Sequence, residues 1–427
     1  MRTKILTGKV FSALMVIGAV CMYFISDQTL EWIYPFYCKY IIQSLVSWGR
    51  IATMAVVFPS AVIVFIRNRN RSFPFHAGMF LPLLCVYAGY FVSCLVNRGE
   101  ADFRHIWDSF SATAVQVLIF VLVFSDEGIF LKNFSEKETA ARLKTTRGDL
   151  FIHLIALGYL ALSLCNIVFY FFPQLYWYME EPNWYDFFLG SKNRVGWPLM
   201  MGAFFAYSDV KLRHWKIMRV LCYILLTVNT AITGCVTLYI GLAAVTVYSL
   251  LPFVRRIFEK WNFYVFTAIL LAMFAVCMWG IDPLLHTTPV KAVLTAVGKD
   301  PSLSERTVIW STGKDLALEK PVFGHGLQAA PDFVPHSNRY GTTYHHAHNE
   351  YLQIWYEGGL ITLAAAFGML FYTGKRLKRA QNVKCAGSVK AFLFFTLVML
   401  LAELIPYYCW YIATVLCNSG VLLAERT

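Results

Sequence analysis

Residues able to transfer protons are concentrated in the segment HHAHNEYL, where three histidines precede a long apolar run. His348 and Asn349 close a polar stretch, and Glu350 stands at the start of the apolar run. The N-terminus of a helix disfavours imidazolium, so a helix that begins here should leave His348 neutral and able to accept a proton. A neutral imidazole at a membrane surface can deprotonate a hydroxyl nucleophile. Two alternatives stay open: a polar loop without chemistry, and a metal site of three histidines that no neighbouring Cys or carboxylate cluster supports.

A second group of candidate residues is basic. Arg306 lies in a polar loop, and Lys192 and Arg194 precede an apolar segment. A guanidinium presents a fixed fork of donors that suits phosphate, so several such residues on one membrane face predict an anion site. The alternative for each is a side chain that reaches into the membrane interface or pairs with a carboxylate. Arg98 and Arg104 are expected on the same face, and their contact with phosphate stays an open question.

Glu403 is an ionisable residue near the end of the apolar segment LLAELIPYY. Charged groups are costly in a membrane, so they are commonly paired or functional. We expect Glu403 either to pair with one of the basic residues or to orient the site.

The composition indicates that a membrane bundle positions these residues. The 427 residues are 58% hydrophobic and 15% charged, whereas soluble proteins have roughly 25% charged residues. A helix that crosses a membrane needs about 20 mostly apolar residues. The sequence therefore predicts an all-α integral membrane protein with about twelve transmembrane helices and one large periplasmic loop that contains short helices. The predicted spans are 8–26, 36–66, 76–97, 106–125, 151–172, 195–208, 217–234, 236–254, 262–280, 351–373, 388–404 and 407–424.

The distribution of basic residues predicts the topology. Every second loop is basic, which places both termini on the cytoplasmic side. The chain then divides into nine spans over 1–281, an external loop over 282–350 and three spans over 351–427. Six of the ten histidines lie in that loop, which also contains a predicted helix, SERTVIWSTGKDLALEK, with Ser304 as its N-cap and Pro321 after its end. The net charge of +12 arises from these loop clusters, so we do not expect a nucleic acid partner.

The external loop resembles that of the O-antigen ligase and polymerase superfamily of bacterial membrane glycosyltransferases. That family has an Arg and a Trp on a helix, then P-x-x-G-x-G, then H-N-x-x-L with a Gly shortly after. The matching residues here are Arg306, Trp310, Pro321, Gly324, Gly326, His348, Asn349, Leu352 and Gly358. The combination covers about 55 residues and lies late in a bundle of about twelve predicted spans, as in the family.

The resemblance implies a metal-independent, inverting transfer of glycan from undecaprenyl diphosphate, without a cofactor, at the periplasmic face of the bacterial inner membrane. In the ligase branch the acceptor is a sugar hydroxyl of lipid A–core. By this resemblance His348 would be the general base, and Arg194 and Arg306, with Lys192 beside them, would bind the diphosphate. Asn349 would orient His348 or contact the acceptor, with Trp310 and Glu403 in support.

Two other functions compete with the ligase. An O-antigen polymerase or a protein O-oligosaccharyltransferase would share the donor and the histidine, although the single modest external loop favours a ligase. A transporter of lipid-linked glycans is less favoured, because transporters often have internal repeats and charged residues at the membrane midplane. This sequence has no visible repeat, and its polar groups gather at one face.

Overall fold

The computed structural model describes residues 16–24, 48–49, 51–52, 54–55, 58–59, 81–99, 101–124, 147–172, 186–191, 195–208, 216–296, 306–327, 346–378, 383–403, 411 and 413–414. Within these ranges the regular secondary structure is helical apart from one small hairpin, and short turns join the helices. The helices are α4 (Leu81–Val96), α5 (Phe103–Phe124), α7 (Arg147–Phe171), α8 (Gly196–Ser208), α9 (Lys216–Thr233), α10 (Val236–Leu250), α11 (Pro252–Lys260), α12 (Phe263–Trp279), α13 (Ile281–Leu285), α14 (Thr288–Ala296), α15 (Arg306–Glu319), α16 (Glu350–Leu377) and α17 (Val383–Met399). The hairpin pairs β1 (Asp186–Phe187) with β2 (Gly190–Ser191) in antiparallel register.

Helices cover most of each predicted span that the structure describes. The predicted span 236–254 is wrong in its last part, because α10 ends at Leu250 and α11 begins at Pro252, at 94° to α10. Proline restricts the residue before it to extended backbone, as seen at Leu251. The predicted spans 8–26, 36–66 and 407–424 fall largely outside the described residues. By length and composition, Leu150–Phe171 and α16 can each cross a membrane, and α10 with α11 would make a third if that bent pair were one span. The apolar helices fit an integral membrane protein, and the count of twelve spans stays a prediction.

Local sequence explains where several helices begin and end. Gly234, with φ of 57°, separates α9 from α10 because glycine adopts this left-handed conformation at little cost. Pro252 occupies the first turn of α11, where its missing N–H removes no helical hydrogen bond. Asn262 and Asn349 cap α12 and α16, each with a side-chain oxygen that accepts from backbone N–H groups of the first turn.

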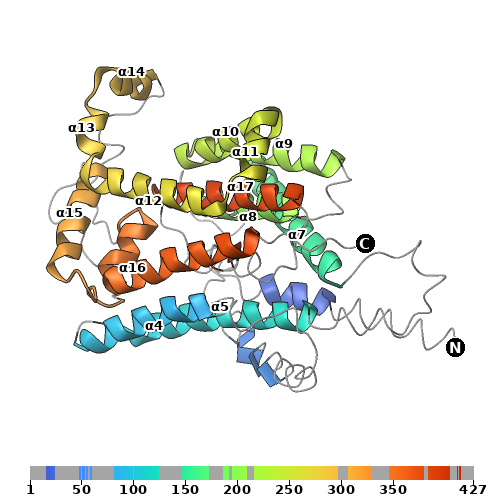
Figure 1. Ribbon diagram of the computed structural model, residues 1–427. Coiled ribbons are helices and arrows are strands. Elements are labelled where there is room, and N and C mark those ends of the chain that lie inside the picture. The colour runs from blue at the N-terminus through green and yellow to red at the C-terminus, as the bar shows by residue number, and fades with distance from the viewer. Residues whose placement is uncertain are drawn as a thin grey trace.

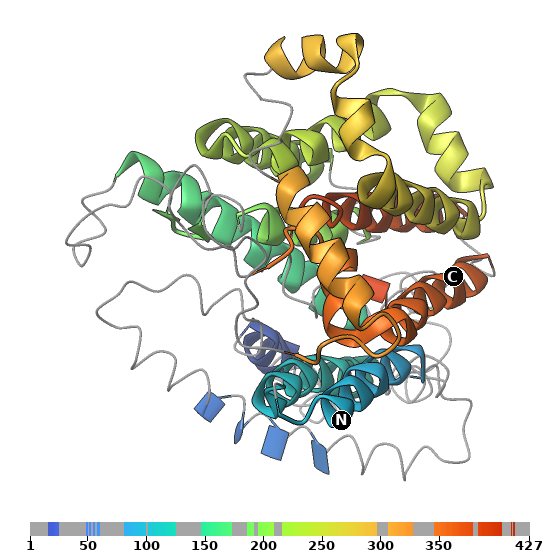
Figure 2. The same cartoon turned by 90° about the vertical axis from the view of Figure 1, so that its left-hand side faces the viewer.

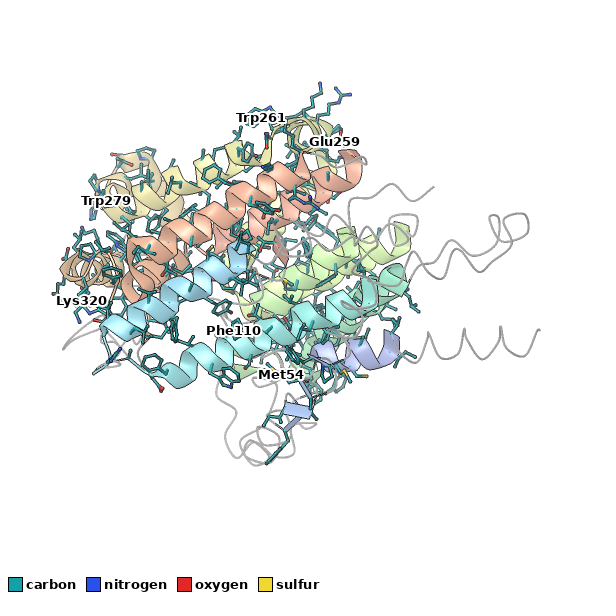
Figure 3. The ribbon with its side chains drawn as sticks, turned by 60° about the horizontal axis from the view of Figure 1, so that its bottom comes forward. Met54, Phe110, Glu259, Trp261, Trp279 and Lys320 are labelled. Carbon is teal, nitrogen blue, oxygen red and sulfur yellow. The ribbon has the colours of Figure 1, made fainter. Side chains whose placement is uncertain are left out.

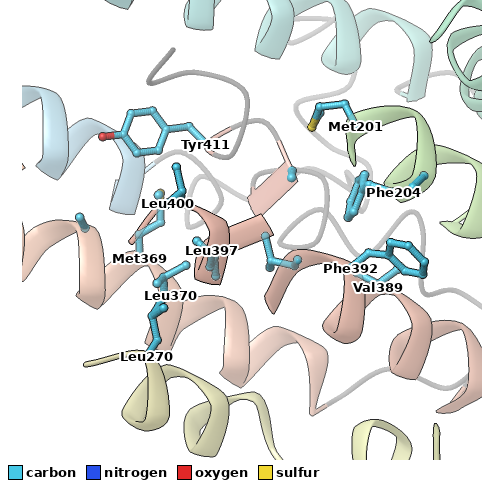
Figure 4. Packing of buried hydrophobic residues seen from close by; sticks show 14 of the residues in the cluster. Met201, Phe204, Leu270, Met369, Leu370, Val389, Phe392, Leu397, Leu400 and Tyr411 are labelled. Carbon is cyan, nitrogen blue, oxygen red and sulfur yellow. The ribbon is translucent and has the colours of Figure 1, made fainter. Parts of the chain in front are cut away.

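Long helices lie side by side in the bundle, and α13, α14 and α15 gather at one end of it (Figure 1). α16 packs along α4 closely enough that a Cβ on Gly89 would lie 2.4 Å from Thr362 Oγ1. Small residues permit such close approach between membrane helices. The apolar core continues from α12 and α16 to α8 and α17, where Leu270, Met369, Leu397 and Phe204 are all buried (Figure 4).

Candidate active site

Glu403 joins three parts of the chain that are distant in sequence. One of its carboxylate oxygens, Oε1, accepts a hydrogen bond from the guanidinium of Arg306, at the start of α15. The same oxygen accepts from Thr237 Oγ1 at 3.1 Å. The other oxygen, Oε2, lies 3.5 Å from Nδ1 of His348, which precedes α16. The predicted base and one predicted phosphate ligand therefore meet at one carboxylate. Glu403 pairs with a basic residue, as one of the two expectations had it, and its contact with His348 also suits the other, a role in orienting the site.

Burial makes this arrangement sensitive to the loss of any partner. Glu403 is 4% exposed, and a buried ion pair that loses one member leaves an uncompensated charge, at a cost of about 3–5 kcal/mol. The side chains of Arg306 and His348 are 17% and 15% exposed. Each thus keeps a part of its surface for a ligand while another part contacts Glu403. Figure 2 shows α15, in orange, crossing the near end of the bundle, and Arg306 is the first residue of this helix.

The backbone at His348 is strained, and neighbouring side chains hold it in place. His348 has φ of 47°, alone among the described non-glycine residues in being positive. Such a conformation costs on the order of 1–3 kcal/mol and persists where its surroundings impose it. On one side, Asn349 Oδ1 accepts from the N–H groups of Tyr351 and Leu352, both at 3.1 Å. On the other side, Gln353 Oε1 accepts from the N–H of Ala347 at 2.9 Å.

Gln353 also links the histidine segment to the kink in α16. Its Nε2 donates to Glu357 Oε1 at 2.7 Å, and both side chains are buried. Neither residue was singled out from the sequence. The available signal was helical spacing, since Asn349, Gln353 and Glu357 recur every four residues and so share a face of α16.

Replacing Gln353 with methionine should lower kcat by about 10- to 100-fold and leave the KM for the donor nearly unchanged. Methionine fills a similar volume but cannot accept the hydrogen bond from the N–H of Ala347. His348 would then shift slightly, and small displacements of a catalytic group lower the rate by this amount. Glu357→Gln is the matched control, because it keeps the oxygen that accepts from Gln353. Steady-state kinetics of both variants test this, and equal losses in the two would show that Gln353 acts through folding.

The predicted P-x-x-G-x-G motif fits against a break in α16. Gly359, with φ of 70° and ψ of −177°, interrupts the helix. The N–H of Leu360 then donates to Pro321 O at 2.8 Å, and the N–H groups of His325 and Gly326 donate to Tyr356 O and Glu357 O at 2.8 and 2.9 Å. The motif therefore satisfies the backbone groups that the break exposes, as buried peptide groups require. It fixes the C-terminal end of α15 to α16.

Glycine is required on both sides of this junction. A Cβ on Gly359 would lie 2.1 Å from Val322 O, and one on Gly324, whose φ is 69°, would lie 2.5 Å from Gly359 N. Both contacts are to backbone atoms, which cannot move aside as a flexible side chain could. The motif glycines are thus explained by close packing.

Gly359→Ala should destabilise the fold by at least about 3 kcal/mol, because it adds a backbone clash to a conformation that only glycine adopts readily. Gly368→Ala in the same helix is the matched control, since a Cβ there would meet nothing within 4 Å. That change should stabilise by about 0.5–1 kcal/mol. Thermal unfolding in detergent compares the two, and a Gly359→Ala midpoint equal to that of the wild type would contradict the close packing.

The other predicted residues are placed differently. Trp310 is 4% exposed and lies one turn after Arg306, where it anchors α15. Lys192 and Arg194 lie outside the described residues. Val195, which follows them, is buried, and a Cβ on Gly196 would lie 3.5 Å from Leu238 and Met399 side chains. Gly196 therefore lies beside Leu238 and Met399, which are close in sequence to Thr237 and Glu403.

The hairpin before Lys192 is held by a buried amide pair. Asn166 Oδ1 on α7 accepts from the N–H of Leu189 at 3.0 Å, and its Nδ2 donates to Asn229 Oδ1 on α9 at 2.8 Å. α7 and α9 therefore hold the hairpin that precedes residues 192–194, the segment that contains the predicted phosphate ligands Lys192 and Arg194.

Arg98 lies near the other end of α15. Its loop contacts the motif turn, where Asp102 N donates to Leu327 O at 2.8 Å and Ala101 lies against Gly326. A helix of this length spans about 20 Å, so the turn and Arg306 are well separated. The side chain of Arg104 is outside the described set.

The metal interpretation has little support in the described part of the chain. His346 lies beside His348, with ring centroids 4.1 Å apart. Among the residues that the structure describes, no group of three or more His, Cys, Asp or Glu side chains could hold a metal ion. His345, which belonged to that interpretation, falls outside them.

Residues 221–367 match the family model described as O-antigen ligase. No curated protein and no solved structure matches the chain. The matched segment contains Arg306, the glycine junction and His348, whereas Glu403 lies beyond it. The match supports membership of the O-antigen ligase/polymerase superfamily.

Proposed function

We propose that this member of the O-antigen ligase/polymerase superfamily is a ligase of the bacterial inner membrane. It transfers glycan from undecaprenyl diphosphate to a sugar hydroxyl of lipid A–core, and the external loop 282–350 supplies the catalytic residues. The observation that carries the proposal is the meeting of Arg306 and His348 at Glu403. One group suited to an anionic leaving group thus lies beside one suited to a hydroxyl.

His348 is the proposed general base. Glu403 faces Nδ1, so a proton on Nδ1 is favoured and Nε2 is left to accept the proton of the acceptor hydroxyl. The hydroxyl oxygen attacks the anomeric carbon from the side opposite the diphosphate, with inversion, and the bond to the diphosphate oxygen breaks. The imidazolium that forms is stabilised by the carboxylate.

The leaving diphosphate carries the charge that develops in this step. Arg306, whose side chain is 17% exposed and whose guanidinium donates to Glu403, binds this diphosphate. We assign Arg194 and Lys192 to the same diphosphate, because the described chain on their C-terminal side lies next to the neighbours of Glu403. Preorganised donors of this kind lower the barrier because they need no reorganisation during the reaction.

Reconstitution tests the acceptor. Purified full-length protein is mixed with undecaprenyl-diphosphate glycan and either lipid A–core, more donor or a Ser-containing acceptor protein. Glycan-capped lipid A–core is the expected product. Lengthening of the donor glycan would show a polymerase, and glycosylated protein would show an oligosaccharyltransferase. Movement of intact donor across the vesicle membrane without any transfer would indicate a transporter.

Transfer should continue in excess EDTA at a rate within about two-fold of the untreated rate. Positive charge at the leaving group comes from Arg306 and its basic partners, and the nucleophile is activated by an imidazole, so neither task needs a metal. The initial rate is measured before and after chelation, with a known metal-dependent glycosyltransferase as the positive control. Loss of activity that Mg²⁺ or Zn²⁺ restores would instead support a metal at the histidines.

A further inference from the structure

Helix α11 runs in a direction very different from that of α10, the helix before it. It makes an angle of 94° with α10, and Leu251 between them is extended, with φ of −99° and ψ of 105°. α10 is an apolar helix that runs with the bundle. If α10 crosses the membrane, a helix perpendicular to it is oriented along the membrane surface.

Exposed residues of α11 and its ends are of two kinds. Arg255, Arg256 and Lys260 are exposed and basic, while Phe253 and Trp261 are large apolar residues, 60% and 47% exposed. Aromatic and basic side chains together are typical of helices that lie in the membrane interface. If α11 were instead part of a broken span, three exposed cations would lie in hydrocarbon, which is costly.

This helix lies at the opposite end of the molecule from the proposed active site. Figure 3 shows Glu259 and Trp261 at one end, and Trp279 and Lys320 at the other. α12 connects the two ends, running from Phe263 to Trp279. Because the loop with α15 is proposed to be periplasmic, α11 lies on the cytoplasmic side, where basic residues are expected.

Contacts with α17 hold α11 in this orientation. Phe258 is buried and stacks on Phe266, with ring centroids 4.5 Å apart. Lys390 of α17 donates from Nζ to Glu259 O at 3.2 Å and to Trp261 O at 2.9 Å. This cation satisfies carbonyls at the helix C-terminus, where positive charge is favourable. The outer face, with Arg255 and Arg256, is thereby presented away from the bundle.

We propose that α11 binds anionic phospholipid headgroups of the cytoplasmic leaflet. Phe253 and Trp261 enter the interface, and Arg255, Arg256 and Lys260 contact the phosphates. Charge complementarity favours this partner, since the leaflet is anionic and each basic residue near it strengthens binding by roughly five-fold.

Native mass spectrometry of the full-length protein in detergent tests the proposal, with phosphatidylglycerol and phosphatidylcholine titrated separately. The test variant is Arg255→Gln/Arg256→Gln. The matched control is Lys375→Gln/Lys378→Gln, which removes two exposed basic residues at the end of α16. We expect the wild type to prefer phosphatidylglycerol, and the test variant to bind it roughly 10- to 30-fold more weakly. The control should keep the wild-type preference.

Two outcomes would overturn the proposal. If the test variant keeps its preference for phosphatidylglycerol, lipid is not the occupant, and a cytoplasmic protein becomes the partner to seek. If both variants lose the preference equally, the effect is general charge attraction and α11 is no distinct site. Thermal unfolding of each variant ensures that folded proteins are compared. Since the readout is lipid binding, the result is independent of whether the protein is a ligase.

Discussion

His348→Ala should reduce the rate of glycan transfer by about 10²- to 10⁴-fold, the range typical for loss of a general base. The donor should still bind, because the proposed diphosphate ligands remain. The measurement is transfer to lipid A–core by reconstituted protein, together with binding of labelled donor. A base is needed only for the chemical step, so loss of turnover with retained binding is the expected pattern.

His346→Ala is the matched control for this prediction. Its ring centroid lies 4.1 Å from that of His348, so both variants disturb the same segment. His348 is the histidine whose Nδ1 lies 3.5 Å from Glu403 Oε2 and which we propose as the base, so we expect His346→Ala to retain most activity. If His346→Ala were the more damaging change, the base would be assigned to the wrong histidine.

Arg306→Lys should lower kcat by about 10²- to 10³-fold, comparable to the loss of a preorganised donor at a developing charge. Lysine keeps the positive charge but cannot reproduce the planar fork that contacts Glu403 and phosphate together. The initial rate at saturating donor is the measurement. Lys314→Gln is the control on the same helix and should be close to wild type. Lys314 is partly exposed and lies 4.0 Å from the exposed Asp315, and such solvent-accessible pairs contribute little.

A double variant separates catalysis from structure. Because Glu403 also contacts His348, the reference for the double variant Arg306→Met/Glu403→Gln is Glu403→Gln alone. If Arg306 only neutralises Glu403, the double variant should be as active as Glu403→Gln. If Arg306 binds the leaving group, the double variant should be far less active than Glu403→Gln. The difference between the single and double changes measures the coupling directly. Equal turnover in these two variants would reassign Arg306 to a structural role.

The sequence alone predicted most of the described membrane helices and supplied the candidate residues for the site. Apolar runs of suitable length predicted the helices, because each run must be buried or face lipid whatever its neighbours are. The change from a polar stretch to an apolar run at Glu350 marked the start of α16, because such a change can be recognised within a few residues. The histidine segment and Arg306 were recognisable because their chemistry belongs to the side chain itself.

Tertiary structure alone decided which of these residues meet. Glu403 and Arg306 are 97 positions apart, and no local rule indicates that a carboxylate ending one apolar helix contacts the start of a loop helix. Thr237 was not predicted because a threonine in an apolar run usually bonds within its own helix. The glycine motif could be recognised in the sequence, but the sequence did not show why glycine is required at these positions. Gly324 and Gly359 are needed because two backbone segments, distant in sequence, approach too closely for any Cβ, and such a contact exists only in the folded chain.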